Sequence, residues 1–145
     1  MSIQTAVGLA EQFLYQQLST DTALAALVGS NIFARTIPEG TSYPAIVYQL
    51  YSSVDGIGSG FSYYLTTSMY VVRAADRVGS ISGLDAIMYR VRQLLHGQAN
   101  VILAGGAMLA CQRERNLTEP DQPIAGVETR TLAALYRVVT QEVYP

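Results

Sequence analysis

The segment Thr20–Tyr51, TDTALAALVGSNIFARTIPEGTSYPAIVYQLY, contains the clearest structural signals in the chain. Thr20 is a suitable N-cap for a helix, and the negative charge of Asp21 is favourable in the first turn. Gly29 stands just past the last apolar residue of this pattern, where a glycine commonly ends a helix. The first part of the segment therefore predicts a short helix between Thr20 and Gly29.

Two strands are expected after this helix. Residues 31–36, NIFART, precede a turn through Pro38 and Gly40, because these two residue types commonly interrupt regular structure. The Tyr43-Pro44 step then leads into residues 45–52, AIVYQLYS, a strongly apolar run. The segment as a whole predicts the order helix, strand, turn, strand.

Hydrophobic periodicity predicts the remaining elements. Apolar residues at helical spacing indicate helices at 3–18 and 83–95, and Ser82-Gly83-Leu84-Asp85 is typical of a capping box at the start of the latter. Alternating patterns indicate strands at 63–75, 107–113 and 127–139. The predicted order is α-α-β-β-β-α-β-β. A chain of 145 residues suits one core, so we expect a single domain over residues 1–145.

The spacing of the strands indicates the fold class. They arrive in hairpin-sized steps without regular βα alternation, which favours an α+β fold: a mostly antiparallel sheet with about three helices packed on one face. The second and the last strand carry apolar side chains on both faces, although helices on one side cover only one face. A second apolar face is unfavourable in water unless another chain covers it. The pattern therefore favours an oligomer.

Composition narrows the class of partner. Half of the residues are apolar and only 14% are charged, against about 25% in an ordinary soluble domain. The net charge of −2 gives no electrostatic basis for binding nucleic acid or an anionic membrane. All nine cationic residues are arginine, and the chain has ten tyrosines. Arginine and tyrosine both suit surfaces that become buried on assembly.

Neither an export signal nor a membrane span is expected. The N-terminal residues lack a basic start, and Glu11 and Gln12 interrupt the first apolar run. No window has the roughly 18 uninterrupted apolar residues of a membrane helix. Cys111 is the only cysteine, so the chain has no internal disulfide. We expect a protein that is made and used in a cytoplasm.

The sequence predicts no catalytic, cofactor or metal site. His96 follows a predicted helix, where it can interact with the helix dipole, and Cys111 lies in an apolar strand as a buried thiol. One histidine and one cysteine do not make a zinc site. The run Gly56–Gly60 precedes a strand and lacks the G-K-[ST] ending of a phosphate loop. We interpret residues 53–60 as a mobile loop.

The segment 20–51 resembles the opening of the tail-completion, or tail-terminator, proteins of long-tailed bacteriophages and related prophage or gene-transfer particles. The resemblance rests on Leu27-Val28-Gly29, on the short strand with Ile32-Phe33, and on Tyr43-Pro44 followed by Ala45–Gln49. In motif it covers residues 20–51, and in the order of elements it extends over most of the chain.

The resemblance implies a structural virion protein without catalytic residues or cofactor. Members of the family are small α+β subunits of a six-membered ring on the last layer of the tail tube. The ring stops tail polymerisation and joins the filled head. The implied partners are further copies of the chain, the tail tube protein and a head-tail connector or neck protein. DNA would pass through the ring lumen without specific binding, and no membrane is involved.

The family provides no short motif that identifies the contact residues, so these are proposed from position. We expect contacts on two loops, 55–60 and 116–126, and on arginines at or near strand ends. The candidate interface residues are Asp55, Gly58, Arg73, Arg77, Arg113, Arg115, Glu119 and Asp121.

Two alternatives to a tail terminator remain open. A neck protein, such as a head-closure or adaptor ring, is similar to a tail terminator in size and also assembles into a ring. A small cytoplasmic enzyme or ligand-binding domain would need a constellation of polar groups in a pocket. The shortage of histidine, cysteine, lysine and clustered carboxylates argues against that second alternative.

Overall fold

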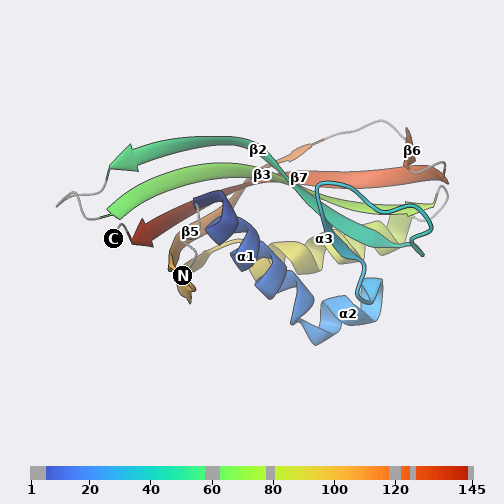
Figure 1. Cartoon of the computed structure of the whole chain (residues 1–145). Coiled ribbons are helices and arrows are strands. Elements are labelled where there is room, and N and C mark those ends of the chain that lie inside the picture. Colours follow the sequence, from blue (N-terminus) through green and yellow to red (C-terminus); the bar gives the residue numbers. More distant parts are fainter. Residues whose placement is uncertain (1–5, 58–62, 78–80, 118–121, 125–126, 144–145) are drawn as a thin grey trace.

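A twisted sheet forms one layer of the molecule, and three helices lie against one of its faces (Figure 1). The computed structural model describes residues 6–57, 63–77, 81–117, 122–124 and 127–143. Its helices are α1 (Ala6–Ser19), α2 (Thr22–Val28) and α3 (Ile81–Leu95). Its strands are β1 (Ile32–Ala34), β2 (Ala45–Ile57), β3 (Tyr63–Arg77), β4 (Gln98–Leu103), β5 (Gly106–Leu117), β6 (Gln122–Ile124) and β7 (Val127–Val143). The predicted α+β class is confirmed.

The strand that is last in sequence lies in the middle of the sheet. The order across the sheet is β1-β2-β3-β7-β5-β4, and β6 pairs with the beginning of β7. Strands β2 to β7 pair antiparallel, as predicted, whereas the short β1 runs parallel to β2. β3 pairs with β7 along its whole length, from Tyr63 opposite Val143 to Arg77 opposite Thr129.

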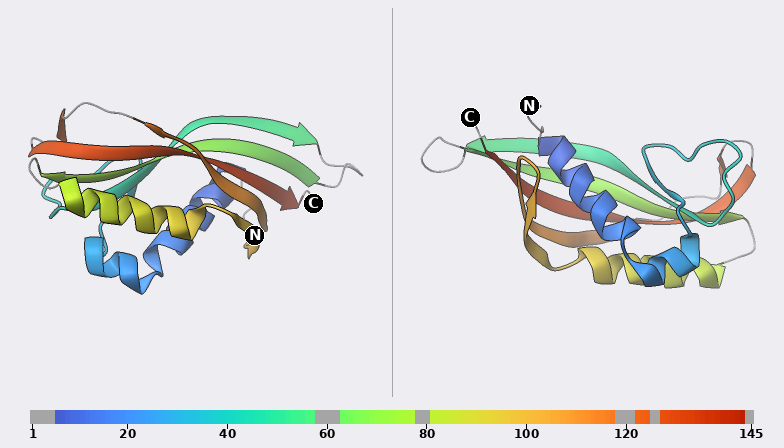
Figure 2. Two further views of the ribbon diagram at one scale, coloured as in Figure 1. Left: turned by 180° about the vertical axis from the view of Figure 1, so that it is seen from behind. Right: turned by 60° about the horizontal axis from the view of Figure 1, so that its bottom comes forward.

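The core lies between the sheet and the helices. Of the residues that the helical spacing of the first helix indicated, α1 buries Ala10, Phe13, Leu14 and Leu18, and α3 buries Leu84, Val91 and Leu95. Alternation along the central strands supplies the other half of the core. The side chains that point toward the helices are Tyr70, Val72 and Ala74 from β3, and Ala134, Tyr136 and Val138 from β7. Figure 2 shows the helices on this side of the sheet in two further views.

The hairpin of β4 and β5 packs tightly against the centre of the molecule at Gly106. A Cβ atom there would meet the backbone carbonyl of Gln141 on β7, and it would lie 2.7 Å from Cδ1 of Leu9 on α1. Glycine is therefore the only residue that fits without displacing β7 or α1.

The cap of α2 differs from the prediction. Asp21, not Thr20, is the N-cap, and its side chain accepts a hydrogen bond from the Leu24 N–H at 2.8 Å. The hydroxyl of Thr20 instead donates to the carbonyl of Gln16 in the last turn of α1. Gly29 ends α2 as predicted, with φ of 64° and its N–H donating to the carbonyl of Ala25.

Several boundaries were also wrong. β2 continues to Ile57, so the first part of the predicted loop 53–60 is strand, and β5 extends to Leu117. The strands β4 and β6 were not predicted at all. α3 begins at Ile81, which places Ser82 inside the helix rather than at its cap.

Candidate assembly surfaces

The face of the sheet opposite the helices carries a small apolar cluster that no described helix covers. Val71 of β3 packs beside Ala133 and Leu135 of β7, and Met69 and Leu117 lie against them. The two larger side chains are only 6% and 4% exposed, because their neighbours on the same face enclose them. We call this side the open face. Its apolar strip confirms the predicted two-sided sheet.

Arginine side chains frame the strip. Arg73 donates from Nη1 to Oε1 of Gln49 on β2 at 3.3 Å. Arg137 of β7 forms an ion pair with Glu114 of the neighbouring strand β5, with 2.9 Å between Nε and Oε1. Exposed ion pairs of this kind contribute little to stability. Apolar strips bordered by arginine are common in protein interfaces.

The structure separates the predicted contact residues. Arg115 lies opposite Leu135 and so shares the open face with Arg73, whereas Arg113 lies opposite Tyr136 on the helix side. Arg77 is exposed at the end of β3. Asp55 belongs to β2 rather than to a loop. Gly58, Glu119 and Asp121 lie outside the described residues.

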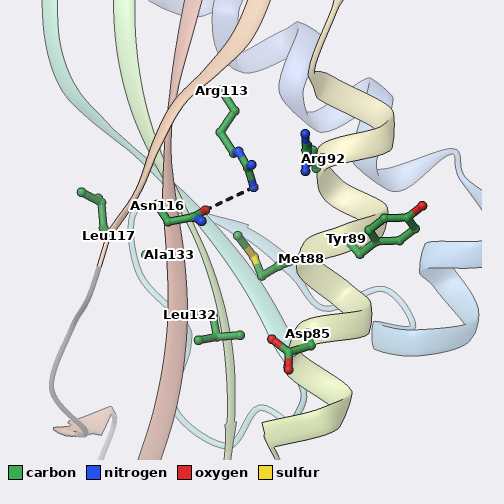
Figure 3. A pocket seen from close by; sticks show the side chains of 9 residues that line it. All are labelled: Asp85, Met88, Tyr89, Arg92, Arg113, Asn116, Leu117, Leu132 and Ala133. Carbon is green, nitrogen blue, oxygen red and sulfur yellow. Dashed lines mark hydrogen bonds between the residues drawn. The ribbon is translucent and has the colours of Figure 1, made fainter.

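A cavity of about 370 Å³ opens between α3 and the strands β5 and β7 (Figure 3). Its apolar wall consists of Met88, Leu132 and neighbouring residues, and its polar wall includes Arg92 and Arg113. Arg113 donates from Nη1 to Oδ1 of Asn116 at 3.2 Å. The full lining is Asp85, Met88, Tyr89, Arg92, Arg113, Asn116, Leu117, Leu132 and Ala133.

Beside the arginines of this cavity, Tyr136 is fully buried, and its hydroxyl has no hydrogen-bond partner among the described residues. Burial raises the pKa of Tyr136 to about 12, and the charges of Arg113 and Arg92 oppose that rise only in part. The phenol therefore stays protonated at neutral pH and is not a general base.

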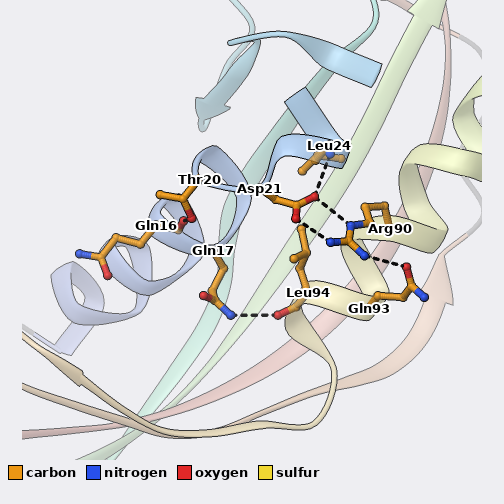
Figure 4. A network of polar contacts seen from close by, with 8 residues as sticks. All are labelled: Gln16, Gln17, Thr20, Asp21, Leu24, Arg90, Gln93 and Leu94. Atoms are coloured by element: carbon orange, nitrogen blue, oxygen red, sulfur yellow. Dashed lines mark hydrogen bonds and ion pairs between the residues drawn. The ribbon is translucent and has the colours of Figure 1, made fainter. Parts of the chain in front are cut away.

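Polar contacts join the three helices in addition to the core that they share (Figure 4). Both carboxylate oxygens of Asp21 accept from Arg90 on α3, at 2.6 and 2.8 Å. These hydrogen bonds lower the pKa of Asp21. Gln17 of α1 donates to the carbonyl of Leu94 at 3.1 Å. This network fixes the helix layer, and we assign it a structural role.

The two residues that sequence analysis examined as possible catalysts have structural positions. Nδ1 of His96 accepts a hydrogen bond of 2.9 Å from the N–H of Arg113, which links the end of α3 to β5. Cys111 is buried, and burial raises the pKa of its thiol to about 12. A protonated, buried thiol is a poor nucleophile. The described part of the chain holds no cluster of three or more potential metal ligands.

Sequence analysis missed the features that now stand out, the two borders of the sheet. Of the large apolar side chains that are exposed, Leu50, Tyr51 and Val54 lie on β2 and Ile102 lies on β4. The predicted strand 45–52 included Leu50 and Tyr51, but Val54 fell in the predicted loop, β4 was not predicted, and the sequence did not place either strand in the sheet. Among the described helices, none is long and apolar enough to cross a membrane.

The fold is shared with a solved virion structure. The chain matches a chain from the virion of a native gene transfer agent particle with a TM-score of 0.70 and 20% sequence identity. The match covers 94% of this chain and 98% of the other. A search among curated protein sequences finds no significant match. The family model of tail completion protein gp17, however, matches residues 12–140, nearly the whole chain, and this protein therefore belongs to the gp17 family of tail completion proteins.

Proposed function

We propose that this protein is the subunit of a ring, six-membered as in the proteins that it resembles, which caps the tail tube. The ring ends tail polymerisation and forms the joint to the head. Membership in a family of tail completion proteins supports a structural role in the virion. The fold shared with a chain of a gene transfer agent particle agrees with that role.

The open face is the observation that carries the proposal. Val71, Ala133 and Leu135 form an apolar strip on a side where no described helix packs. Arginine borders the strip, and the aromatic residues of the chain are mostly tyrosine. The strip itself is almost fully enclosed, but Val54 of β2 and Ile102 of β4 are exposed on the same face, and their apolar area would gain stability if a further protein covered it.

The proposed partners follow from a ring placed at the end of a tube. One side contacts the tail tube protein, the other a connector or neck protein, and each subunit contacts two further copies. The net charge of −2 gives DNA in the lumen no attractive surface to bind. The role needs neither a cofactor nor a catalytic residue.

Electron microscopy of particles that lack the gene tests the proposal. Tails of uncontrolled length without filled heads are expected, because nothing would stop the addition of tube protein. Tails of normal length beside unjoined or leaking heads would instead assign the protein to the neck. Intact, infectious particles would contradict both structural roles.

A matched pair of variants shows whether the open face matters. Ala110 of β5 is exposed on the open face, opposite Val139, and Ala26 is exposed on α2. Both positions receive the same new charge in Ala110→Glu and Ala26→Glu. The α2 variant is expected to restore tail length in the deletion background, and the β5 variant is not. If both variants restored tail length, the open face would not be a contact surface.

A further inference from the structure

β2 leaves most of its outer border without a partner. Its inner side pairs with β3 from Ala45 to Ile57, but β1 pairs only with Ile46–Tyr48. Beyond Tyr48, no described strand lies beside β2, and Figure 1 shows this half of the strand at the border of the sheet. Unpaired backbone N–H and C=O groups along such a border are a template for another strand.

The side chains along this border do not discourage pairing. Val54 is 70% exposed and Tyr51, at a bulge in the strand, is 66% exposed. In residues 49–57, QLYSSVDGI, the only charged residue is Asp55. Natural sheets usually protect an exposed border with lysine, proline or several charges. The regular part of β2 beyond the bulge, Ser52–Ile57, is six residues long.

The opposite border of the same sheet has matching properties. β4 is the last strand on that side, is six residues long and contains no charged residue in QANVIL. Ile102 is 87% exposed, more than any other large apolar side chain in the described part of the chain. Its register partner Ala107 lies opposite Gln141, which places Ile102 on the open face.

The two borders correspond in level, face and direction. The registers connect Val54 across the sheet to Ala99 through Thr67, Val139 and Ala110. Val54 and Ile102 therefore both belong to the open face, and both are near the same level of the sheet. The four antiparallel pairings between β2 and β4 reverse direction four times, so that β2 and β4 run the same way.

We propose that the border of β2 in one copy pairs with the border of β4 in the next, as parallel strands, and joins the sheets of the ring into one continuous belt. The contact uses two different surfaces of the chain, and such head-to-tail contacts generate a closed ring when the rotation from one copy to the next closes. Exposed Val54 would then pack beside Ala99 or Ile102 of the neighbour, as cross-strand pairs do. The inference rests on the proposed function, since it names the contact between subunits of that ring.

Cysteine cross-linking in particles assembled from the full-length chain tests the contact. The buried thiol of Cys111 leaves the native chain suitable as the background. We combine Val54→Cys with Ala99→Cys in one variant and with Ile102→Cys in another, and treat the particles with a short bismaleimide. At least one variant is expected to shift most of the chain from monomer to a ladder that extends beyond dimers. Each single variant is expected to remain monomeric.

The control and the contrary outcomes are specific. Tyr89 is 62% exposed on α3, away from both borders, so Val54→Cys with Tyr89→Cys is expected to give no ladder. Dimers of Val54→Cys alone would mean that β2 pairs with itself. A cross-link from Val54→Cys to a different protein would mean that a tube or neck strand occupies this border. Either result, or the absence of a ladder from both double variants, overturns the inference.

A second measurement tests the contact in case the cysteine variants fail to assemble into particles. Val54→Lys and Ile102→Lys place a charge on each border, and both are expected to fold with unchanged melting temperature but to lose restoration of tail length. Tyr89→Lys is the control that keeps it. Full restoration by both border variants would contradict the pairing. Tails of normal length in the deletion strain would contradict the proposed role as a tail terminator. Tails of uncontrolled length in that strain, together with no ladder from the double cysteine variants, would contradict only the strand contact.

Discussion

The hydroxyl of Tyr136 lies in the core without a hydrogen-bond partner among the described residues. Burying a polar group without a partner costs about 1–3 kcal/mol. The aromatic ring, in contrast, stabilises the core through the apolar area that it buries. Ring and hydroxyl therefore act in opposite directions at one position.

Tyr136→Phe is expected to leave the free energy of unfolding unchanged or to raise it by about 1 kcal/mol. The change removes the unpaired hydroxyl and keeps the ring. Denaturant unfolding of the two proteins measures the difference. Ser68→Ala is a companion variant, because the Ser68 hydroxyl is buried and unpaired in the same way. A loss above about 1 kcal/mol in Tyr136→Phe would mean that the hydroxyl has a partner such as an internal water.

The cap of α2 is a single-residue feature that the sequence alone did not predict correctly. Thr20 and Asp21 are adjacent, and both have side chains that cap helices well. The choice between them depends on Arg90, 69 residues further along the chain, which binds the Asp21 carboxylate. Local patterns do not contain such a distant partner. Gly29, whose role depends only on its own backbone, was predicted correctly.

At the scale of elements, Asp21 has two roles: its side chain caps α2 and it accepts hydrogen bonds from Arg90 of α3. Asp21→Ala is expected to lower the free energy of unfolding by about 1 kcal/mol from the lost cap alone. Thr20→Ala is the control, since its hydroxyl is exposed and contacts only the carbonyl of Gln16 in the described structure. Its effect is expected to stay within about 0.5 kcal/mol. Equal losses would mean that Thr20 shares the capping role.

The same pair makes stability depend on pH. The contact with Arg90 lowers the pKa of Asp21 below its ordinary value of 3.8, so the folded state favours the charged form. The resulting stability is fully present above pH 3.8 and is lost as the pH falls through the lowered pKa. Asp21→Asn keeps a cap oxygen and removes the charge. The difference in unfolding free energy between wild type and this variant is expected to shrink below pH 3.8. A difference that does not change with pH would contradict the ion pair.

The elements that were predicted well are those with strong internal patterns. The alternation in residues 63–75 and 127–139 predicted the strands β3 and β7, although it did not say which of their two faces the helices cover. β4 was missed because QANVIL is short and alternates poorly, with Asn100 at a φ of 57° in the middle. Pairing with β5 makes it a strand. The end of β2 was missed because Gly56 indicates a loop, whereas pairing with β3 holds it in the sheet.

At the scale of the whole molecule, the resemblance to tail-completion proteins is confirmed by the family match over residues 12–140. The predicted contact residues stay a prediction. Which residues make contacts depends on the surfaces that other proteins cover, and the sequence of one chain does not give those proteins. The borders of the sheet were likewise invisible, because the order β1-β2-β3-β7-β5-β4 does not follow the order of the sequence.

The single domain over residues 1–145 stays a prediction, and cooperative unfolding tests it. Helices and sheet share one large core, so far-UV circular dichroism and tyrosine fluorescence are expected to report the same transition. Different midpoints for the two signals would mean that part of the chain unfolds separately.

The central place of β7 has a consequence for synthesis. Among the described strands, β1-β2-β3 and β5-β4 form two parts of the sheet, and only β7 bridges them. A ribosome makes these ten elements from α1 onward, so the bridge emerges after both parts. Until then, the inner borders of β3 and β5 have no partner, and the nascent chain holds two incomplete sheets. The sheet is completed only after β7 has been made, and until then the unpaired borders of β3 and β5 are sites at which nascent chains are prone to aggregate.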